Sequence, residues 1–255
     1  MTDVLTIFGS KSDEATYENI LKVLKKEKIS YDFKIASAHK TPEDVDNILR
    51  QDYKVIISGA GLAAALPGVV AAKTIRPVIG VPCQGSYQGL DALLSIAQMP
   101  PGIPVLSTGV GKGDTAAYNA VKMLKKQEKV VLVGDKNNKA FKKAEEILRE
   151  FGVNHSHSEQ IIDNAVNIQF VYFDEPIEKK EQLVIYCPLL LEDDDKAEAS
   201  LNLLKHSDHG LWVGLNNGTN AALAAIEILN IDNSFEQKLV NYRGQIGKKV
   251  REANK

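Results

Sequence analysis

The chain has few of the residues that mark specialised classes of protein. Its 255 residues include only 2 cysteines and 1 tryptophan, and aromatic residues make up 6%. Cys83 and Cys187 form neither a disulfide framework nor a CxxC metal pair. No apolar run approaches the roughly 20 residues of a membrane-spanning helix, and the amino-terminal residues are not typical of a signal peptide. The net charge is −2, whereas a nucleic-acid binder needs a basic face. We therefore expect a cytoplasmic protein without nucleic-acid or membrane partners.

The sequence is instead rich in alternating strand and helix patterns. A short apolar run at 4–8 ends at a glycine, and residues 14–29 carry apolar side chains at helical spacing. Further strands are expected at 31–37, 54–61, 77–83 and 103–109, with helices at 42–50, 66–75, 89–99 and 114–124. This alternation predicts an α/β fold with a parallel sheet covered by helices on both faces.

The pattern then repeats in the second half of the chain. Residues 129–153 parallel residues 4–29, with a strand, a glycine, a nearby lysine and a helix in the same order. Two later pairs also correspond, namely 184–188 with 78–82 and 211–229 with 105–124. We expect two homologous halves, residues 1–127 and 128–230, followed by a terminal helix within 231–255. That helix carries an apolar stripe, and we expect the stripe to dock on a neighbouring subunit. The stripe consists of Phe235, Leu239, Tyr242 and Ile246.

Small polar residues follow the first strand of the first half. Gly9 permits a tight turn, and the hydroxyls of Ser10 and Ser12 sit beside the free N–H groups of a helix start. This arrangement predicts an anion site, because the N-terminus of a helix attracts negative charge. The alternative is that Ser12 or Asp13 simply caps the helix.

A histidine and a lysine stand at the end of the second strand, in "SAHKTP". His39 and Lys40 lie just before a helix start, with Thr41 as the expected N-cap and Pro42 in its first turn. The third strand ends in "SGAGLAAALPG", whose glycines allow close approach of a ligand or, alternatively, tight packing of helix on sheet. Carboxyl ends of parallel strands share one rim of the sheet, so these loops are expected to form one site.

These motifs resemble the PurE family of purine biosynthesis. The resemblance rests on "GSKSD", "SAHKTP", "GAG…AALPGVVAAKT", "PVIGVP" and "GLDALLSIAQMP", which occur in order through nearly all of the first half. It implies a flavodoxin-like three-layer α/β/α fold, duplicated here in tandem, and formation of 4-carboxy-5-aminoimidazole ribonucleotide without a metal or organic cofactor. Because the family forms octamers of single domains, a duplicated chain is expected to form a homotetramer.

The resemblance also implies roles for individual residues. His39 is the expected proton shuttle at C4 of the imidazole, which suits its ordinary pKa range. The hydroxyls of Ser10, Ser12 and Ser37 are expected to bind the phosphate together with Lys40. Asp13 is expected to bind the ribose, and the loop after the third strand is expected to bind CO2. The expected substrate-binding residues are Ser10, Ser12, Asp13, Ser37, Ala38, Lys40, Gly59, Gly61, Leu62 and Ala63.

Two departures from the family bear on the carboxyl source. Lys40 stands where the mutase branch commonly has arginine, and Ala65 where that branch has histidine. Lysine after the histidine is more typical of the carboxylase branch, whereas "LPGVVAAKT" and "SIAQMP" resemble the mutase branch. We expect direct carboxylation of aminoimidazole ribonucleotide by CO2. The alternative is an N5-carboxyaminoimidazole ribonucleotide mutase, which moves the carboxylate from N5 to C4.

The second half is expected to be structural. Asp135 replaces Ser10 and would repel a phosphate, while His155 and His157 fall at solvent-facing positions away from the strand tip. The acidic run 191–198 is expected to be a solvated turn rather than a metal site. Two rival interpretations are a catalytically silent nucleotide-binding module and a flavin protein. The flavin alternative would need aromatic stacking loops, and the rim offers only Tyr87.

Overall fold

The computed structural model describes residues 2–173, 177–191 and 193–254. Glu192, in the acidic run of the second half, and the two terminal residues of the chain lie outside the described residues. No helix within the described ranges is both long enough and apolar enough to cross a membrane.

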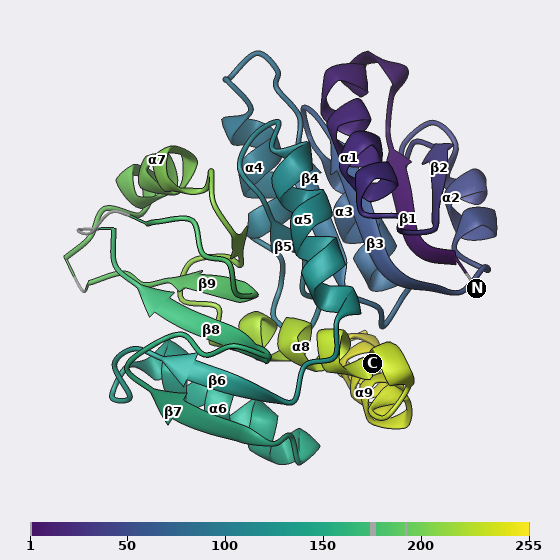
Figure 1. The fold of residues 1–255 in the computed structure, drawn as a ribbon. Coiled ribbons are helices and arrows are strands. Elements are labelled where there is room, and N and C mark those ends of the chain that lie inside the picture. The colour runs from purple at the N-terminus through teal and green to yellow at the C-terminus, as the bar shows by residue number, and fades with distance from the viewer. Residues whose placement is uncertain (1, 174–176, 192, 255) are drawn as a thin grey trace.

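The first half alternates strands and helices as expected (Figure 1). Its elements are β1 (Thr2–Phe8), α1 (Glu14–Lys26), β2 (Tyr31–Ile35), α2 (Pro42–Ile48), β3 (Tyr53–Ala60), α3 (Ala65–Ala72), β4 (Val78–Pro82), α4 (Leu90–Ala97), β5 (Leu106–Ser107) and α5 (Gly113–Leu124). A short 3₁₀ turn, Lys11–Asp13, precedes α1.

The second half contains the strands and helices that its repeat predicts, and two more. Its elements are β6 (Lys129–Val133), α6 (Lys139–Phe151), β7 (His155–Ser158), β8 (Ala165–Val171), β9 (Val184–Pro188), α7 (Lys196–His206), β10 (Leu211–Trp212), α8 (Gly218–Leu229), a 3₁₀ turn (Asn230–Asp232) and α9 (Glu236–Glu252). The sequence patterns did not predict β8 or α7.

The strands of the described part form one sheet in the order β2-β1-β3-β4-β5-β10-β9-β8-β6-β7. Each half contributes five parallel strands, and in both halves the strands lie in the order second, first, third, fourth, fifth from the outer edge inward. The halves meet where β5 and β10 pair antiparallel, with Ser107 opposite Trp212. The fold is therefore α/β and flavodoxin-like, with a mostly parallel sheet. The common strand order supports our division into two repeats, which remains a proposal.

Residues of β1 alternate between two apolar layers, because successive side chains of a strand point to opposite faces. Phe8 packs on one face with Tyr17 of α1, and their rings meet edge to face at 5.6 Å. Leu5 and Ile7 belong to the layer on the other face, together with Leu66 of α3. The sheet is thus sandwiched between helices, as the sequence pattern predicts.

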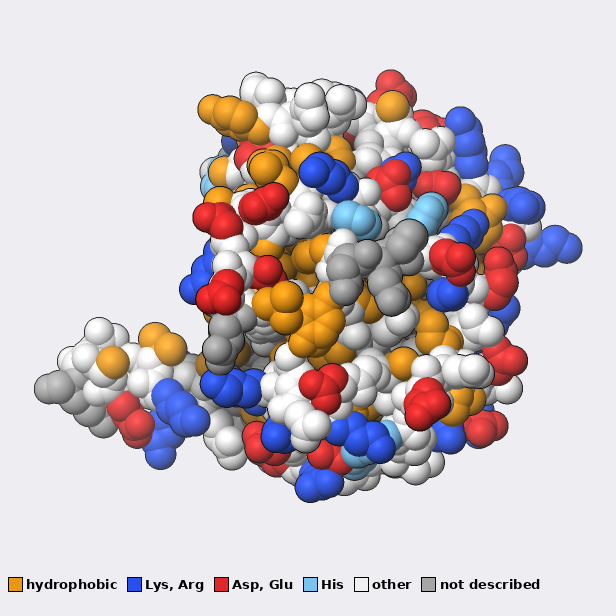
Figure 2. All heavy atoms as spheres, turned by 90° about the vertical axis from the view of Figure 1, so that its left-hand side faces the viewer, with side chains coloured by type: hydrophobic (Ala, Val, Ile, Leu, Met, Phe, Trp, Pro, Cys, Tyr) orange, Lys and Arg blue, Asp and Glu red, His pale blue; other side chains and the backbone are white. Residues whose placement is uncertain are grey.

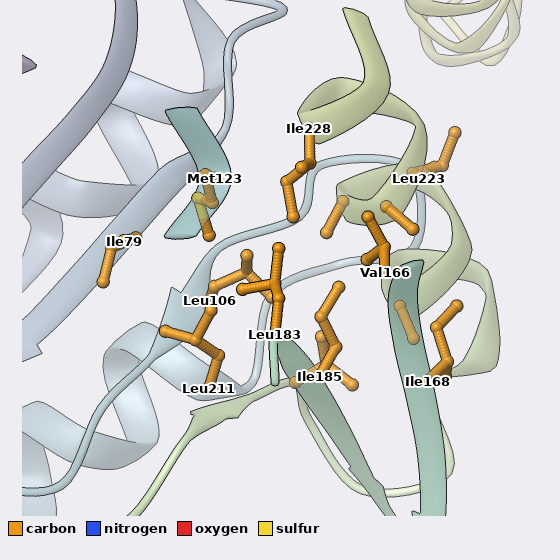
Figure 3. Packing of buried hydrophobic residues seen from close by; sticks show 14 of the residues in the cluster. Ile79, Leu106, Met123, Val166, Ile168, Leu183, Ile185, Leu211, Leu223 and Ile228 are labelled. Carbon is orange, nitrogen blue, oxygen red and sulfur yellow. The ribbon is translucent and has the colours of Figure 1, made fainter. Parts of the chain in front are cut away.

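One apolar core runs across the junction of the halves (Figure 3). Leu106 of β5 lies beside Leu183 and Leu211 of the second half, and none of the three is more than 3% exposed. A polar contact crosses the same junction, where the buried Asn220 side chain of α8 accepts a hydrogen bond from Gly102 N at 2.8 Å. Because their core is shared, the two halves form a single packed unit.

The apolar stripe of α9 packs on its own chain. Leu239 is 1% exposed within the main core, and the Tyr242 ring meets Phe151 of the second half at 5.6 Å. Ile246 lies against Gly102 of the first half. Phe235, Tyr242 and Ile246 stay half-buried in the single chain, so our expectation that the stripe also docks on a neighbouring subunit remains a prediction. The helix covers the seam between the halves, where both contribute apolar surface that would otherwise face water.

The face that carries α7, β8 and β9 shows charges of both signs around a hollow with apolar side chains (Figure 2). Lysine and arginine alternate there with aspartate and glutamate. The described part of this face does not present the continuous basic surface that nucleic-acid binding needs.

Candidate active site

A cavity of about 410 Å³ opens at the carboxyl ends of β1, β2 and β3. It is lined by Gly9, Ser10, Ser12, Asp13, Ser37, Ala38, His39, Lys40, Ala60, Gly61, Leu62, Ala63, Ala64, Ala65, Leu66 and Gln84. All the predicted site residues except Gly59 are in this set. The three loops meet because β1 pairs with β2 on one side and with β3 on the other, with the same polarity.

The loop after β1 is built around the hydroxyl of Ser10. Its Oγ accepts hydrogen bonds from Ser12 N at 3.1 Å and from Ser12 Oγ at 2.7 Å, which caps the 3₁₀ turn before α1. Asp13 occupies the N-cap position of α1 but makes no side-chain capping bond. The cap is thus provided by Ser10 rather than by Ser12 or Asp13. Both serines are exposed at the cavity, where they can also donate to an anion.

His39 and Lys40 stand at the apex of a closed turn. Ser37 N donates to Thr41 Oγ1 at 2.9 Å, and Thr41 N donates back to Ser37 O at 2.9 Å. Lys40 N donates to Ser37 Oγ at 3.3 Å. Thr41 is the N-cap residue of α2, but its hydroxyl closes this turn instead of capping the helix. The turn fixes the backbone on both sides of His39, and its imidazole is exposed at the cavity wall.

Asp13 lies where the cavity meets the core. Its partial burial raises the pKa of the carboxyl, and a hydrogen bond from Cys83 partly opposes that effect. Burial also raises the pKa of the Cys83 thiol, so this group stays protonated, and its single proton is shared between Asp13 and Val81 O, which lies 3.7 Å from Sγ. A half-buried carboxyl with one donor beneath it can still accept hydrogen bonds from a ligand.

The two glycines of the third loop have different roles. A Cβ on Gly59 would lie 2.1 Å from the ring of Phe8, so the absence of a side chain is required by core packing. Gly59 does not line the cavity, and our interpretation of it as a substrate contact has no support from the geometry. Gly61 does line the cavity, and a Cβ there would meet Cys83 only at 3.6 Å.

Leu62 adopts an unusual backbone conformation at the rim of the cavity. Its φ is +56°, a region that non-glycine residues seldom occupy, and its side chain is 63% exposed. Such local strain concentrates where surrounding structure holds a loop in a fixed shape for binding. The following alanines, Ala63 to Ala65, line the cavity beside it with small apolar side chains.

Sequence reasoning missed part of the cavity wall. Gln84, just after β4, lines the cavity with an exposed amide, and nothing in its local sequence pattern distinguishes it from an ordinary loop residue. Lys40 and Ala65, the two departures from the family pattern, both line the cavity. Any effect of these departures would therefore act directly on a bound ligand.

The corresponding place in the second half is differently built. Asp135 Oδ1 accepts from Asn137 N at 2.9 Å, which repeats the bond between Ser10 and Ser12 with a carboxylate in place of the hydroxyl. By strand register, Val133 is opposite Gln169 as Phe8 is opposite Gly59, so a long polar side chain replaces the glycine. The cavity at this place measures about 580 Å³, and its lining includes Glu159 as well as Lys136 and His157.

The remaining histidines and acids of this half make local contacts. His155 Nδ1 is 2.8 Å from Val153 O, and His157 Nε2 is 2.9 Å from a Glu145 oxygen. Asp195 caps α7 through two backbone N–H groups, which lowers the pKa of its carboxyl. In the described ranges, no group of three or more histidine, cysteine or acidic residues is placed to hold a metal ion.

Comparison with known proteins identifies the first half. The model of the family described as AIR carboxylase matches residues 3–133, just over half of the chain. The chain belongs to the AIR carboxylase family. The resemblance drawn from the sequence motifs is therefore confirmed for these residues, and this is a family of purine biosynthesis enzymes.

Relatives in the AIR carboxylase family carry both of the expected activities in their names. N5-carboxyaminoimidazole ribonucleotide mutase of Methanocaldococcus jannaschii is 47% identical over 122 residues, covering 48% of this chain and 78% of the relative. Phosphoribosylaminoimidazole carboxylase of Candida glabrata is 36% identical over 179 residues, covering 68% of this chain and 29% of the relative. The crystal structure of PurE from Treponema denticola is 30% identical, covers 49% of this chain and 83% of that one, and gives a TM-score of 0.44.

Proposed function

We propose that the chain forms 4-carboxy-5-aminoimidazole ribonucleotide by carboxylating C4 of 5-aminoimidazole ribonucleotide with CO2. The observation that carries this proposal is the meeting of three loops at one cavity. One loop presents hydroxyls, one presents His39 and Lys40, and one presents small apolar side chains. The hydroxyls suit the phosphate of a ribonucleotide, His39 can accept a proton, and the small apolar side chains suit CO2.

The phosphate is assigned to the polar side of the cavity. Ser10, Ser12 and Ser37 supply hydroxyl donors, and Lys40 supplies positive charge. Asp13 accepts hydrogen bonds from the ribose hydroxyls, since its carboxyl lies deeper than the serines. The base then extends toward the loop from Gly61 to Ala65, where CO2 fits among small side chains.

The reaction needs a proton acceptor rather than a protein nucleophile. C4 of aminoimidazole is enamine-like, so its electron pair attacks the carbon of CO2 and a C–C bond forms. The proton that C4 carries must then leave to restore the aromatic ring, and it passes to the imidazole of His39. Histidine suits this task because its ordinary pKa lies near neutral pH.

The alternative is the mutase reaction, in which the carboxylate comes from N5 of the substrate. The mutase names of several relatives favour it, including the relative from Methanocaldococcus jannaschii. Lys40 and Ala65 favour direct carboxylation, because both replace residues of the mutase branch on the cavity wall. Both reactions give the same product and use the same proton acceptor.

The carboxyl source is tested with purified protein and two substrates. One reaction receives aminoimidazole ribonucleotide with bicarbonate, and the other receives the N5-carboxylated substrate without added bicarbonate. We expect faster product formation in the first reaction. Turnover of the N5-carboxylated substrate alone would establish the mutase, and turnover of neither would favour a silent nucleotide-binding module.

We also propose a cytoplasmic homotetramer in which the second half supplies structure rather than chemistry. The location is supported by the family's place in purine biosynthesis. The half-buried side chains of the α9 stripe are one candidate source of contacts between copies. Tyr87 and Leu62 are 72% and 63% exposed near the cavity and suit contact with another copy. Light scattering should give four times the chain mass of 27.9 kDa. A monomer at working concentration would overturn the assembly.

A further inference from the structure

A second cavity, of about 510 Å³, lies at the opposite end of the first-half strands from the candidate active site. It is bounded by the segment between α2 and β3, by the end of α3 and by α9 (Figure 1). The lining residues that matter here are Arg50, Asp52, Arg76, Glu236, Val240 and Arg243. It shares no lining residue with the candidate active site, and the proposed reaction makes no use of it.

One wall of this cavity holds a buried arginine in a fixed position. The Arg76 side chain is only 10% exposed, its Nη1 donates to Asn230 O at 2.9 Å, and its Nη2 lies 3.2 Å from Asp52 Oδ1. Charged side chains are seldom so deeply buried unless they are paired, and Asp52 is the partner here. With a further contact from Nη2 to Asp52 Oδ2 at 3.4 Å, these bonds use only part of the five-donor guanidinium.

A second arginine reaches the cavity from α9. Arg243 Nη2 donates to the buried Glu227 at 2.8 Å, whereas its Nη1 is buried and has no acceptor within the described residues. Buried donors without an acceptor are rare in folded proteins. Because Nη1 is closed off from solvent, the Arg243 side chain has to shift before this atom can donate to a ligand in the cavity.

The other lining groups determine which charge and polarity a ligand of this cavity should have. Arg50 is exposed and makes no ion pair among the described residues, and Lys73 adds a second exposed positive charge, paired with Asp46. Two carboxylates, Asp52 and Glu236, oppose these charges, and Asp52 is already paired with Arg76. Leu49, Ile75 and Val240 provide an apolar wall, and Val240 is 48% exposed. Three arginines beside an apolar wall suit a phosphate group attached to a flat or apolar body.

We propose that this cavity binds a phosphorylated small molecule of nucleotide size at a site separate from the substrate site. Its volume lies in the range of small-molecule sites, roughly 300–1,000 Å³. A phosphate bound by Arg50 or Arg76 of the first half and by Arg243 of α9 would connect this helix to the first half. Because α9 also packs on Phe151 of the second half, occupancy at this cavity stabilises the whole junction.

The test uses AMP as the probe, with adenosine as the control that lacks phosphate. AMP can also enter the substrate site, so the titrations use the full chain carrying Ser10→Asp, which blocks phosphate there. Isothermal calorimetry should show AMP binding, and thermal unfolding should show a concentration-dependent rise in midpoint. Adenosine should bind at least about tenfold more weakly, since it lacks the group that arginines recognise.

Three further substitutions locate the site. Arg50→Glu should weaken AMP binding about tenfold or more, and Glu236→Gln should tighten it, because each changes charge at the cavity rim. Arg251→Glu is the matched control, since it makes the same charge change on the exposed end of α9. Its affinity should stay within about twofold of the parent. The proposal is overturned if AMP does not bind, if adenosine binds equally well, or if Arg50→Glu and Arg251→Glu have equal effects.

Discussion

Gly59 and Gly61 stand two residues apart, yet alanine substitutions should have different effects at the two positions. Gly59→Ala should lower stability, and Gly61→Ala should lower substrate affinity. An added Cβ on Gly59 would lie 2.1 Å and 2.3 Å from two carbons of the Phe8 ring. That ring is fully buried and already contacts Tyr17, so it has little space to move. The Cβ of an alanine at position 61 would instead lie 3.6 Å from Cys83 Cβ, an ordinary van der Waals distance, and would occupy part of the cavity.

The expected magnitudes follow from these distances. Inserting a methyl group into a packed core typically costs about 1–3 kcal/mol, and the short contacts place Gly59→Ala near the upper end, at about 3 kcal/mol. Gly61→Ala should change the free energy of unfolding by less than about 0.5 kcal/mol. Its effect should fall on substrate affinity, because a methyl group now occupies space at this loop.

Urea unfolding and steady-state kinetics on both variants separate the two effects. We expect a lower urea midpoint with near-normal KM for Gly59→Ala, and a normal midpoint with raised KM for Gly61→Ala. Phe8→Leu removes the clashing ring carbons, so the double variant Phe8→Leu with Gly59→Ala should be more stable than the sum of the single effects predicts. Unchanged stability of Gly59→Ala would refute the packing argument, and additive effects would show that Phe8 is not the obstacle.

Two more predictions concern charge. Ser10→Asp copies Asp135 of the second half and preserves the capping bond, so the loop should fold normally. Affinity for the ribonucleotide should fall, because the new carboxylate repels the phosphate. The neutral Ser10→Asn is the control, and equal affinities of the two variants in calorimetry would mean that no phosphate binds at this loop. Burial raises the pKa of Glu227 from 4.5 to about 7, although Arg243 opposes this, so the folded state binds a proton more tightly than the unfolded state. Glu227 therefore contributes roughly 3 kcal/mol to the free energy of unfolding below pH 4.5, and this contribution is lost as the pH rises through 7. Glu227→Gln should flatten this dependence in urea unfolding across pH 5 to 8, and an unchanged pH profile would contradict the assignment.

The first-half fold was predictable because its strands are short apolar runs that end at glycine or small polar residues. The common direction of these strands then placed the Ser10 and His39 loops on one rim. Strand β8 escaped prediction because Asn167 interrupts its apolar pattern. In the structure that side chain is buried, and it is satisfied by nearby backbone, accepting from Ile162 N at 2.9 Å and donating to Leu183 O at 3.1 Å.

Features that depend on distant contacts were not predictable. The antiparallel seam uses two-residue strands, which carry no periodic signal of their own. An apolar stripe such as that of α9 indicates burial but does not specify whether the covering surface belongs to the same chain. The role of Gly59 likewise depends on Phe8, a residue 51 positions earlier that only the sheet register brings alongside it.

The central claim is that His39 carries the proton from C4, and product formation by His39→Asn tests it most directly. The substitution keeps a polar side chain of similar reach on the turn held by Ser37 and Thr41, so the fold and substrate binding should survive. We predict that product formation falls by about 100-fold or more, the usual contribution of a general acid–base group, with the substrate Kd within a few-fold of the parent. Activity within about tenfold of the parent would contradict the account.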